Sequence, residues 1–257
     1  MLGLTAIVIA QNEERNIGEC LESLQFADEI MVVDSFSTDS TPDLARRHGA
    51  RLLQHQYLSL AAQRNWAIPQ ASHEWILIMD ADERVTPELR EEIVGILRAP
   101  DRNGYEMKRR NFFLGSEIRY SGWQHDWVLR LFPKEKGRYP EKYAHERLVI
   151  EGRIGRLRGR LLHYSYRTVD DCWRKLERYA EWNAMDAAKR GARVSRLYAL
   201  LHPPLRFLKA YLLQGGFLDG KAGLQLCLLT AKYAAAKDAR IRQMQRQPPT
   251  PGPGGAG

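Results

Sequence analysis

The sequence predicts an α/β protein whose core is a mostly parallel sheet with helices on both faces. Three short segments, at residues 4–10, 29–33 and 74–79, have the length and the apolar composition of buried parallel strands. Segments with apolar residues at helical spacing lie between them. Strands that alternate with helices favour a doubly wound sheet with right-handed crossovers.

The first hundred residues divide into elements at clear turn signals. Thr41-Pro42 and Thr86-Pro87 each pair a capping residue with a Pro at the first helical position, so each predicts a helix start. The expected order is a strand at 4–10, a polar turn at 11–14, a helix over 17–24, a strand at 29–33 that ends in Asp34, a loop at 35–42, a strand at 50–54, a helix at 61–71, a strand at 74–79 and a helix from Thr86 to about Leu97.

Beyond Pro100 the pattern changes twice. Residues 104–165 contain short alternating runs, such as 127–132 and 160–166, which predict mixed or antiparallel strands that extend the sheet. From Val169 the spacing is helical, with helices expected at 205–213 and 221–239 and with breaks expected at His202-Pro203-Pro204 and at Gly215-Gly216.

Charge is distributed unevenly along the chain. The net charge is +8, but residues 1–150 carry 19 Lys and Arg against 23 Asp and Glu, whereas residues 151–257 carry 20 against 8. A basic C-terminal half favours an anionic partner, either nucleic acid or an anionic membrane face. Three scattered cysteines form no metal-binding spacing, which suits a reducing cytosol. We expect neither a signal peptide nor a transmembrane helix.

Two carboxylates, Asp80 and Asp82, follow directly after the strand at 74–79. Ligands of open α/β sheets bind at the carboxyl ends of the strands, so this position predicts a ligand site. Carboxylate oxygens suit Mg²⁺ or Mn²⁺ shared with a substrate diphosphate. These residues therefore have two interpretations: a divalent metal site shared with a diphosphate, or an acidic exit from the strand into a loop with no ligand.

Four segments, in order along the N-terminal half, carry a resemblance to a known family. They are 5–14, 32–41, 63–65 and 79–83. This half resembles the family 2 glycosyltransferases, which have the GT-A fold. Further segments around Trp123 and at 130–132, 145–146 and 163–166 are similar to the bacterial subgroup that adds sugars to the lipopolysaccharide core, typified by β-1,4-glucosyltransferases. Ser35 stands where many members have a second Asp.

The resemblance implies a domain organisation. We expect a GT-A domain at 1–167, with a donor half at about 1–100 and an acceptor half at about 101–167. A basic amphipathic helical extension is expected at 168–246, and a disordered Pro/Gly-rich tail at 247–257.

The resemblance also implies roles for individual residues. Asp34 would accept a hydrogen bond from the uracil base, and Asp80 would contact the ribose or a metal-bound water. The expected donor-binding residues are Ala10, Asn12, Glu13, Asp34, Arg64 and Asp80, of which Arg64 pairs with the diphosphate. The expected metal ligands are Asp82, Asp80 and His163.

The resemblance also implies inversion at the anomeric carbon, which needs one general base in a single displacement. Glu146 is the first candidate for that base and Asp126 the second. The expected reaction moves glucose from UDP-glucose to a lipid-linked glycan, such as the lipopolysaccharide inner core. We expect a cytoplasmic enzyme held peripherally on the anionic inner membrane surface, with no nucleic acid partner.

Other functions remain in competition with this prediction. The acceptor could instead be another cell-surface polysaccharide or a protein. A nucleotidyltransferase would need a Gly-rich basic loop near the N-terminus, whereas residues 11–14 are acidic. A membrane-binding or nucleic-acid-binding protein on a degenerate GT-A scaffold would use the basic half without the acids, and the presence of Asp34, Asp80 and Asp82 argues against it.

Overall fold

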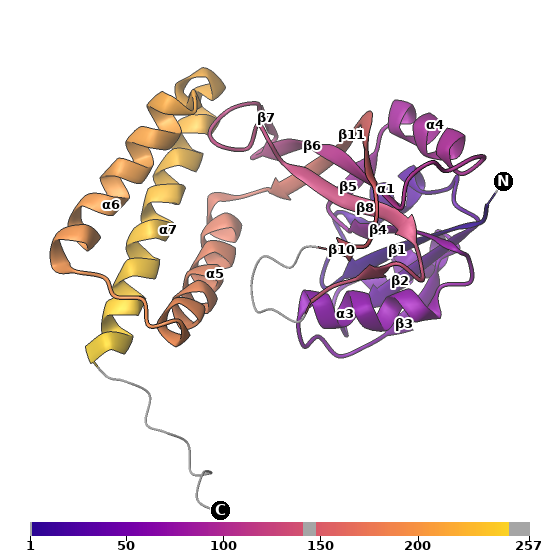
Figure 1. Ribbon diagram of the computed structural model, residues 1–257, viewed down its shortest axis with the longest axis horizontal. Coiled ribbons are helices and arrows are strands. Elements are labelled where there is room, and N and C mark those ends of the chain that lie inside the picture. The colour runs from indigo at the N-terminus through magenta and orange to yellow at the C-terminus, as the bar shows by residue number, and fades with distance from the viewer. Residues whose placement is uncertain (1, 141–147, 247–257) are drawn as a thin grey trace, which may run out of the picture. The chain divides into compact units, whose positions relative to one another are not determined.

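The computed structural model describes residues 2–140 and 148–246 (Figure 1). The chain forms two compact units. The first comprises residues 1–112 and 125–165, and the second comprises residues 113–124 and 166–257.

Half of the sheet in the first unit is parallel, as the sequence predicts. Its strands are β1 (Leu4–Ala10), β2 (Glu29–Asp34), β3 (Arg51–Gln54) and β4 (Trp75–Asp80), in the spatial order β3-β2-β1-β4. Every residue of β1 is buried. Neighbouring residues of this strand enter different apolar clusters, Ile7 one and Val8 the other, because successive side chains of a strand point to opposite faces.

Helices cover both faces of these parallel strands. They are α1 (Ile17–Ser23), α2 (Thr41–Arg47), α3 (Leu60–Ala67) with the 3₁₀ turn η1 (Ile68–Gln70), and α4 (Pro87–Ile96). Leu21 of α1 packs in the cluster of Val8, whereas Ala61 of α3 packs in the cluster of Ile7. Each face of the sheet therefore has its own helices.

The two predicted helix starts have different outcomes. Thr86 caps α4, because its hydroxyl accepts a hydrogen bond from the Leu89 N–H at 3.3 Å. At α2 the prediction is one residue late, since the capping position is Ser40. The Thr41 hydroxyl instead accepts from the Glu13 N–H at 2.8 Å, which ties the start of α2 to the turn after β1.

The other half of the sheet is antiparallel, which confirms the prediction for residues 104–165. The order β4-β8-β6-β11-β5 continues the sheet from β4, and β7 pairs with β6 beside this path. A separate two-stranded sheet is also present. The strands of this half are β5 (Glu83–Val85), β6 (Gly104–Phe113), β7 (Ser116–Ile118), β8 (Trp127–Pro133) and β11 (Ile154–Tyr166), and those of the small sheet are β9 (Gly137–Arg138) and β10 (Val149–Ile150).

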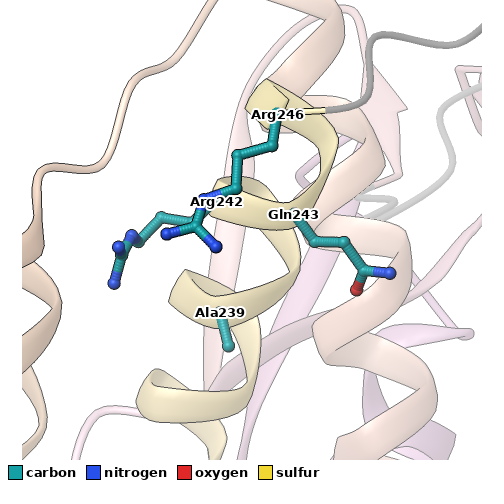
Figure 2. A pocket seen from close by; sticks show the side chains of 4 residues that line it. All are labelled: Ala239, Arg242, Gln243 and Arg246. Carbon is teal, nitrogen blue, oxygen red and sulfur yellow. The ribbon is translucent and has the colours of Figure 1, made fainter.

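The second unit is built mainly from helices packed around their own apolar cluster, which includes Phe113, Cys172 and Leu226. Its helical elements are α5 (Val169–Lys189), α6 (Arg196–Leu208), the π-helical η2 (Lys209–Leu213), the 3₁₀ turn η3 (Gly216–Asp219) and α7 (Gly220–Arg246). No helix among the described residues is long and apolar enough to cross a membrane. Figure 2 shows a pocket beside the last turns of α7, lined by Ala239, Arg242, Gln243 and Arg246. None of these residues belongs to the predicted site.

The predicted break at His202-Pro203-Pro204 is wrong, because α6 continues through both prolines. A Pro inside a helix removes an N–H donor and usually kinks or ends the helix. Here no residue of α6 is fully buried, so water can reach carbonyl groups that lose their partner. The ring of His202 is also held by the buried Asp238 of α7, with 2.6 Å between Nδ1 and Oδ2. The break at Gly215-Gly216 is confirmed, since Gly215 has a left-handed φ of 71°.

Gly159 of β11 tests the contact between this strand and α4. A Cβ added there would lie 2.5 Å from the Cα of Leu89, which is too close for the backbone to accept. We expect Gly159→Ala to lower the free energy of unfolding by about 1–3 kcal/mol, the usual cost of overpacking. Urea denaturation would measure this change.

Gly95 is the matched control, since it lies within α4 and a Cβ there meets nothing within 4 Å. Gly95→Ala should leave stability unchanged or raise it by up to about 1 kcal/mol, because Ala favours helix. Equal effects of the two variants would contradict the packing of β11 on α4.

Candidate active site

The carboxyl ends of three parallel strands bring the predicted donor residues to one edge of the sheet. Ala10 at the end of β1 is paired with Asp34 at the end of β2. Ile9 of β1 is paired with Asp80 at the end of β4. The predicted positions of Ala10, Asp34 and Asp80 therefore meet at the edge where open α/β sheets bind ligands.

The turn after β1 and the loop after β2 form one connected structure. The Asn12 N–H donates to the Ser37 hydroxyl at 2.8 Å, and the Asn12 Oδ1 accepts from the Thr38 N–H at 2.8 Å. Asn12 has a φ of 55°, a left-handed conformation that Asn adopts more readily than most residues. Together with the bond from Glu13 to Thr41, these contacts fix the shape of both loops.

Asp34 is completely buried and anchors the loop that follows it. Its carboxylate accepts hydrogen bonds from the Ser37 N–H at 3.1 Å, from the Ser37 hydroxyl and from Gln54 Nε2 at 3.3 Å. These neutral donors satisfy a carboxylate that would otherwise be costly to bury. Its predicted contact with a nucleobase stays a prediction.

Asp80 lies among three arginines from three different elements. It accepts hydrogen bonds from Arg64 of α3 at 2.7 Å, from Arg109 of β6 at 3.2 Å and from Arg130 of β8. Burial alone would raise the pKa of the Asp80 carboxyl, but Arg130, Arg64 and Arg109 hold that pKa well below its usual range. Asp80 is therefore ionised throughout the physiological pH range.

Glu83 completes this cluster from the first position of β5. Its side chain has no exposed surface. It accepts from Arg109 Nε at 2.7 Å, from Arg130 at 2.8 Å and from the Asp80 N–H at 2.8 Å. Two carboxylates and three guanidinium groups thus form one network, which we call the arginine cluster and define as Arg64, Asp80, Glu83, Arg109 and Arg130.

Some donors near this cluster have no partner among the described residues. They are Arg64 Nε, Arg130 Nε and the hydroxyl of Tyr139, all buried. The Arg64 guanidinium also lies over the Tyr139 ring, 5.0 Å from its centroid. Leaving a buried donor without a partner costs about 1–3 kcal/mol of folding stability. A ligand whose acceptor atoms reached the Nε groups of Arg64 and Arg130 would recover that cost.

Asp82 meets His163 through the pairing of β5 with β11. His163 is in register with Glu83, and the Tyr164 N–H donates to the Asp82 carbonyl at 2.9 Å. This register brings His163 Nε2 to 3.5 Å from Asp82 Oδ2. The predicted pair therefore lies together, although its members are far apart in the sequence.

Asn111 of β6 determines which ring nitrogen of His163 carries the proton. Asn111 Nδ2 donates to Asp126 at 3.1 Å, so its Oδ1 faces His163 Nδ1, at 2.6 Å. An amide oxygen only accepts, and Nδ1 must therefore donate. When Nδ1 carries the proton of a neutral ring, Nε2 presents its lone pair on the side of the Asp82 carboxylate, where a metal ion could accept it.

The donor chemistry at Asp82 and His163 fits a divalent metal. A carboxylate oxygen and an imidazole nitrogen are ordinary ligands, and metal-ligating histidines typically donate their other N–H to a neighbour, as His163 does to Asn111. Two adjacent ligands at about 2.1 Å from an octahedral ion lie roughly 3 Å apart, close to the distance here. Within residues 2–140 and 148–246 no group of three or more His, Cys, Asp and Glu residues is placed to hold a metal.

The two candidate bases differ in what the structure says of them. Asp126 lies just before β8, accepts from Asn111, and is 3.7 Å from Arg109 Nη1. Glu146 lies outside the described residues. Glu83, Arg109, Asn111 and Arg130 were not predicted as site residues. Arg109 and Arg130 reach Glu83 from 26 and 47 residues away, and Asn111 reaches His163 from 52 residues away, so no local spacing links them. Glu83 lies only three residues from Asp80, whose N–H it accepts.

Comparisons with known proteins identify the family of this chain. The model of glycosyl transferase family 2 matches residues 5–161. The lipopolysaccharide core biosynthesis glycosyltransferase LpsC of Rhizobium meliloti (strain 1021) is 34% identical over 94% of this chain and 93% of its own length. An uncharacterized glycosyltransferase of Rickettsia typhi is 25% identical over 95% of this chain and 88% of its own.

One solved structure supports the fold. A mannosyltransferase from Pyrobaculum calidifontis, in complex with GDP-Man and Mn²⁺, superposes with a TM-score of 0.55 at 17% identity, covering 94% of this chain and 87% of the other. This likeness confirms the expected GT-A fold with a C-terminal helical extension, here α5 to α7.

Glu83→Gln tests the arginine cluster. It removes a buried negative charge and leaves Arg109 and Arg130 with one charged partner fewer. We expect the free energy of unfolding to fall by about 3–5 kcal/mol, the usual cost of breaking a buried pair. Urea unfolding monitored by tryptophan fluorescence would measure the loss.

Glu19→Gln is the control, because Glu19 also pairs with an arginine, Arg84, at 3.3 Å, but is 70% exposed. Its loss should cost less than about 1 kcal/mol. The cluster would not be a buried, charge-compensated unit if the two variants proved equally stable.

Proposed function

The chain belongs to glycosyltransferase family 2, and we propose that it transfers a hexose from a nucleotide-diphosphate sugar to a lipid-linked glycan with inversion at the anomeric carbon. UDP-glucose is the proposed donor, and the lipopolysaccharide inner core is the proposed acceptor. The observation that carries the proposal is the pair Asp80 and Asp82 at the sheet edge, with His163 facing Asp82. The name of LpsC supports the acceptor class.

The donor would lie along the edge formed by β1, β2 and β4. We assign the base to Asp34 and to the loop of Ala10, Asn12 and Glu13, whose shape is fixed by the bonds to residues 37–41. Binding there requires Asp34 to exchange one of its present donors for the nucleobase N–H. The exchange is balanced, because one neutral hydrogen bond replaces another.

The diphosphate would lie beside the arginine cluster. Arg64 Nε has no partner among the residues that the structure describes, and the planar guanidinium suits phosphate oxygens. Asp80, held by three arginines, would position the ribose or a metal-bound water. The ion pairs hold these groups in place before the donor binds, so little reorganisation is needed on binding.

Asp82 and His163 would hold the divalent metal, Mg²⁺ or Mn²⁺, with Asn111 fixing the orientation of the ring. A bound metal supplies Lewis-acid stabilisation of the departing diphosphate. The mannosyltransferase with the same fold was solved with Mn²⁺. Asp80 has three arginine partners, so we assign direct coordination to Asp82 and His163 first.

The acceptor hydroxyl must lose its proton as it attacks the anomeric carbon. We assign Glu146 as the general base and keep Asp126 as the second candidate. Because the proposed acceptor is lipid-linked, the proposed location is the cytoplasmic face of the inner membrane, with the protein bound peripherally.

Asp82→Asn and His163→Gln should weaken Mn²⁺ binding in the presence of UDP by roughly tenfold or more, since each replaces a strong protein ligand with a weaker neutral amide. Calorimetric titration of Mn²⁺ into the UDP-saturated protein would measure the change. The same samples, given Mn²⁺ and a panel of UDP-, GDP- and dTDP-sugars, should hydrolyse UDP-glucose fastest in the wild type and slowly in the variants.

His48→Gln is the matched control, because His48 makes a similar contact with Glu22, at 3.6 Å, away from the sheet edge. It should bind Mn²⁺ as the wild type does. Undiminished donor hydrolysis in excess EDTA would refute the metal assignment, whereas hydrolysis of none of the sugars would remove the donor assignment.

Glu146→Gln should lower the turnover number by about 10² or more while the affinity for UDP-glucose stays unchanged, because a general base acts only in the transition state. Asp126→Asn, tested beside it, should alter donor affinity as well, since Asp126 contacts Arg109 and Asn111. A turnover loss confined to Asp126→Asn would assign the base to Asp126 instead.

A further inference from the structure

We propose that the exposed side of α6, together with η2, is a docking surface for an anionic lipid bilayer. The surface is defined by Leu197, Leu200, Leu205, Leu208, Leu212 and Leu213, and we call it the leucine face. It belongs to the second unit and shares no residue with the candidate active site.

Exposure distinguishes α6 from the other long helices. α5 and α7 each bury several residues, but α6 buries none. Leu200 is 71% exposed and Leu213 is 83% exposed. The other side of α6 is already in use, because it packs along α7, as Figure 1 shows, and His202 binds Asp238 there. Several leucines exposed along one helix are more than the singly scattered surface hydrophobics of an ordinary soluble domain and favour an interaction site.

The charge around the leucine face has one sign. Residues 187–218 contain six Lys and Arg and no Asp or Glu. Arg193 and Arg196 are exposed just before and at the start of α6, and Arg206 and Lys209 are exposed near its end. Leucines flanked by basic residues are the pattern of a helix that lies in the membrane interface, with its apolar side among the acyl chains and its cations among anionic headgroups.

A bilayer fits this surface better than other partners. A nucleic acid would use the arginines but would leave the leucines in water. Protein interfaces rely on Trp, Tyr and Arg anchors in pockets, and leucine is under-represented among such anchors. A bilayer, by contrast, accepts aliphatic side chains without requiring shape complementarity. Since α6 has 13 residues, about 20 Å of helix, it would lie along the membrane rather than cross about 30 Å of hydrocarbon.

The experiment is co-sedimentation of the full chain with vesicles of phosphatidylglycerol and phosphatidylcholine, without donor or acceptor. We expect the wild type to pellet at low salt, to pellet less with pure phosphatidylcholine, and to be partly released as the Debye length falls from about 10 Å at 0.1 M to about 3 Å at 1 M salt. Leu200→Gln should weaken binding several-fold, and its combination with Leu197→Gln and Leu205→Gln by roughly tenfold or more.

Matched controls distinguish binding through the leucine face from non-specific adsorption of the protein to vesicles. Leu58→Gln changes a leucine of the first unit that is 72% exposed, and it should pellet as the wild type does. Replacing Arg193 and Arg196 with Gln should release the protein at low salt, whereas replacing the exposed Arg47 and Arg98 should not. Unchanged thermal unfolding would show that each variant remains folded.

Three outcomes would overturn the proposal. The first is a wild type that stays in the supernatant at low salt. The second is an equal effect of Leu200→Gln and Leu58→Gln. The third is self-association or duplex DNA binding that takes the place of vesicle binding. The experiment measures vesicle binding and not sugar transfer. If the protein bound vesicles but transferred no sugar, the proposed function would be wrong and the docking surface would stand.

Discussion

Compensation of the buried charge on Glu83 is the constraint on which the candidate active site depends. An ionised carboxylate with no exposed surface is tolerable only because Arg109 and Arg130 reach it. These arginines come from β6 and β8, and each also contacts Asp80 at the end of β4. The antiparallel half of the sheet is therefore joined to the acidic edge of the parallel half by ion pairs as well as by backbone hydrogen bonds. Arginine suits this task because one planar guanidinium can serve two carboxylates at once.

The same network gives two neighbouring acids different environments. Asp80 faces three cations and stays ionised, whereas Asp82, two residues later, faces the imidazole of His163. The difference arises because the chain turns into β5 at Glu83 and pairs with β11, which places His163 beside Asp82. Asn111 then connects His163 to Asp126, so the metal-binding candidates and the second base candidate share one hydrogen-bonded chain. A change at one of these residues should therefore alter the positions of the others.

The parallel half of the fold could be predicted because its information is local. Short apolar segments predict β1, β2 and β4, and the capping residue Thr86 predicts the start of α4, without information from the rest of the chain. β5 has three residues, too few for a periodic signal, and exists only because β11 pairs with it. Arg109 and Arg130 find their acids through the register of antiparallel strands, which short segments do not encode. The prolines of α6 are a different case, because their local signal is clear but does not decide the structure. Proline disfavours the interior of a helix, and the packing of α6 on α7 outweighs that preference.

Stability alone does not account for the arginine cluster. Well-packed apolar residues in place of a buried ion network are often neutral or stabilising, because moving several charges out of water costs more than their attraction returns. Such a network at the carboxyl edge of β4 therefore indicates a requirement other than stability. It holds the Asp80 carboxylate and the Arg64 guanidinium in fixed positions. Among residues 2–140 and 148–246, the buried Nε donors of Arg64 and Arg130 have no hydrogen-bond partner. Fixed charges with spare donors are what a site needs if it must stabilise a departing diphosphate without reorganising. In this chain the buried charges of the arginine cluster lie at the carboxyl edge of β4, where departure of the diphosphate is proposed.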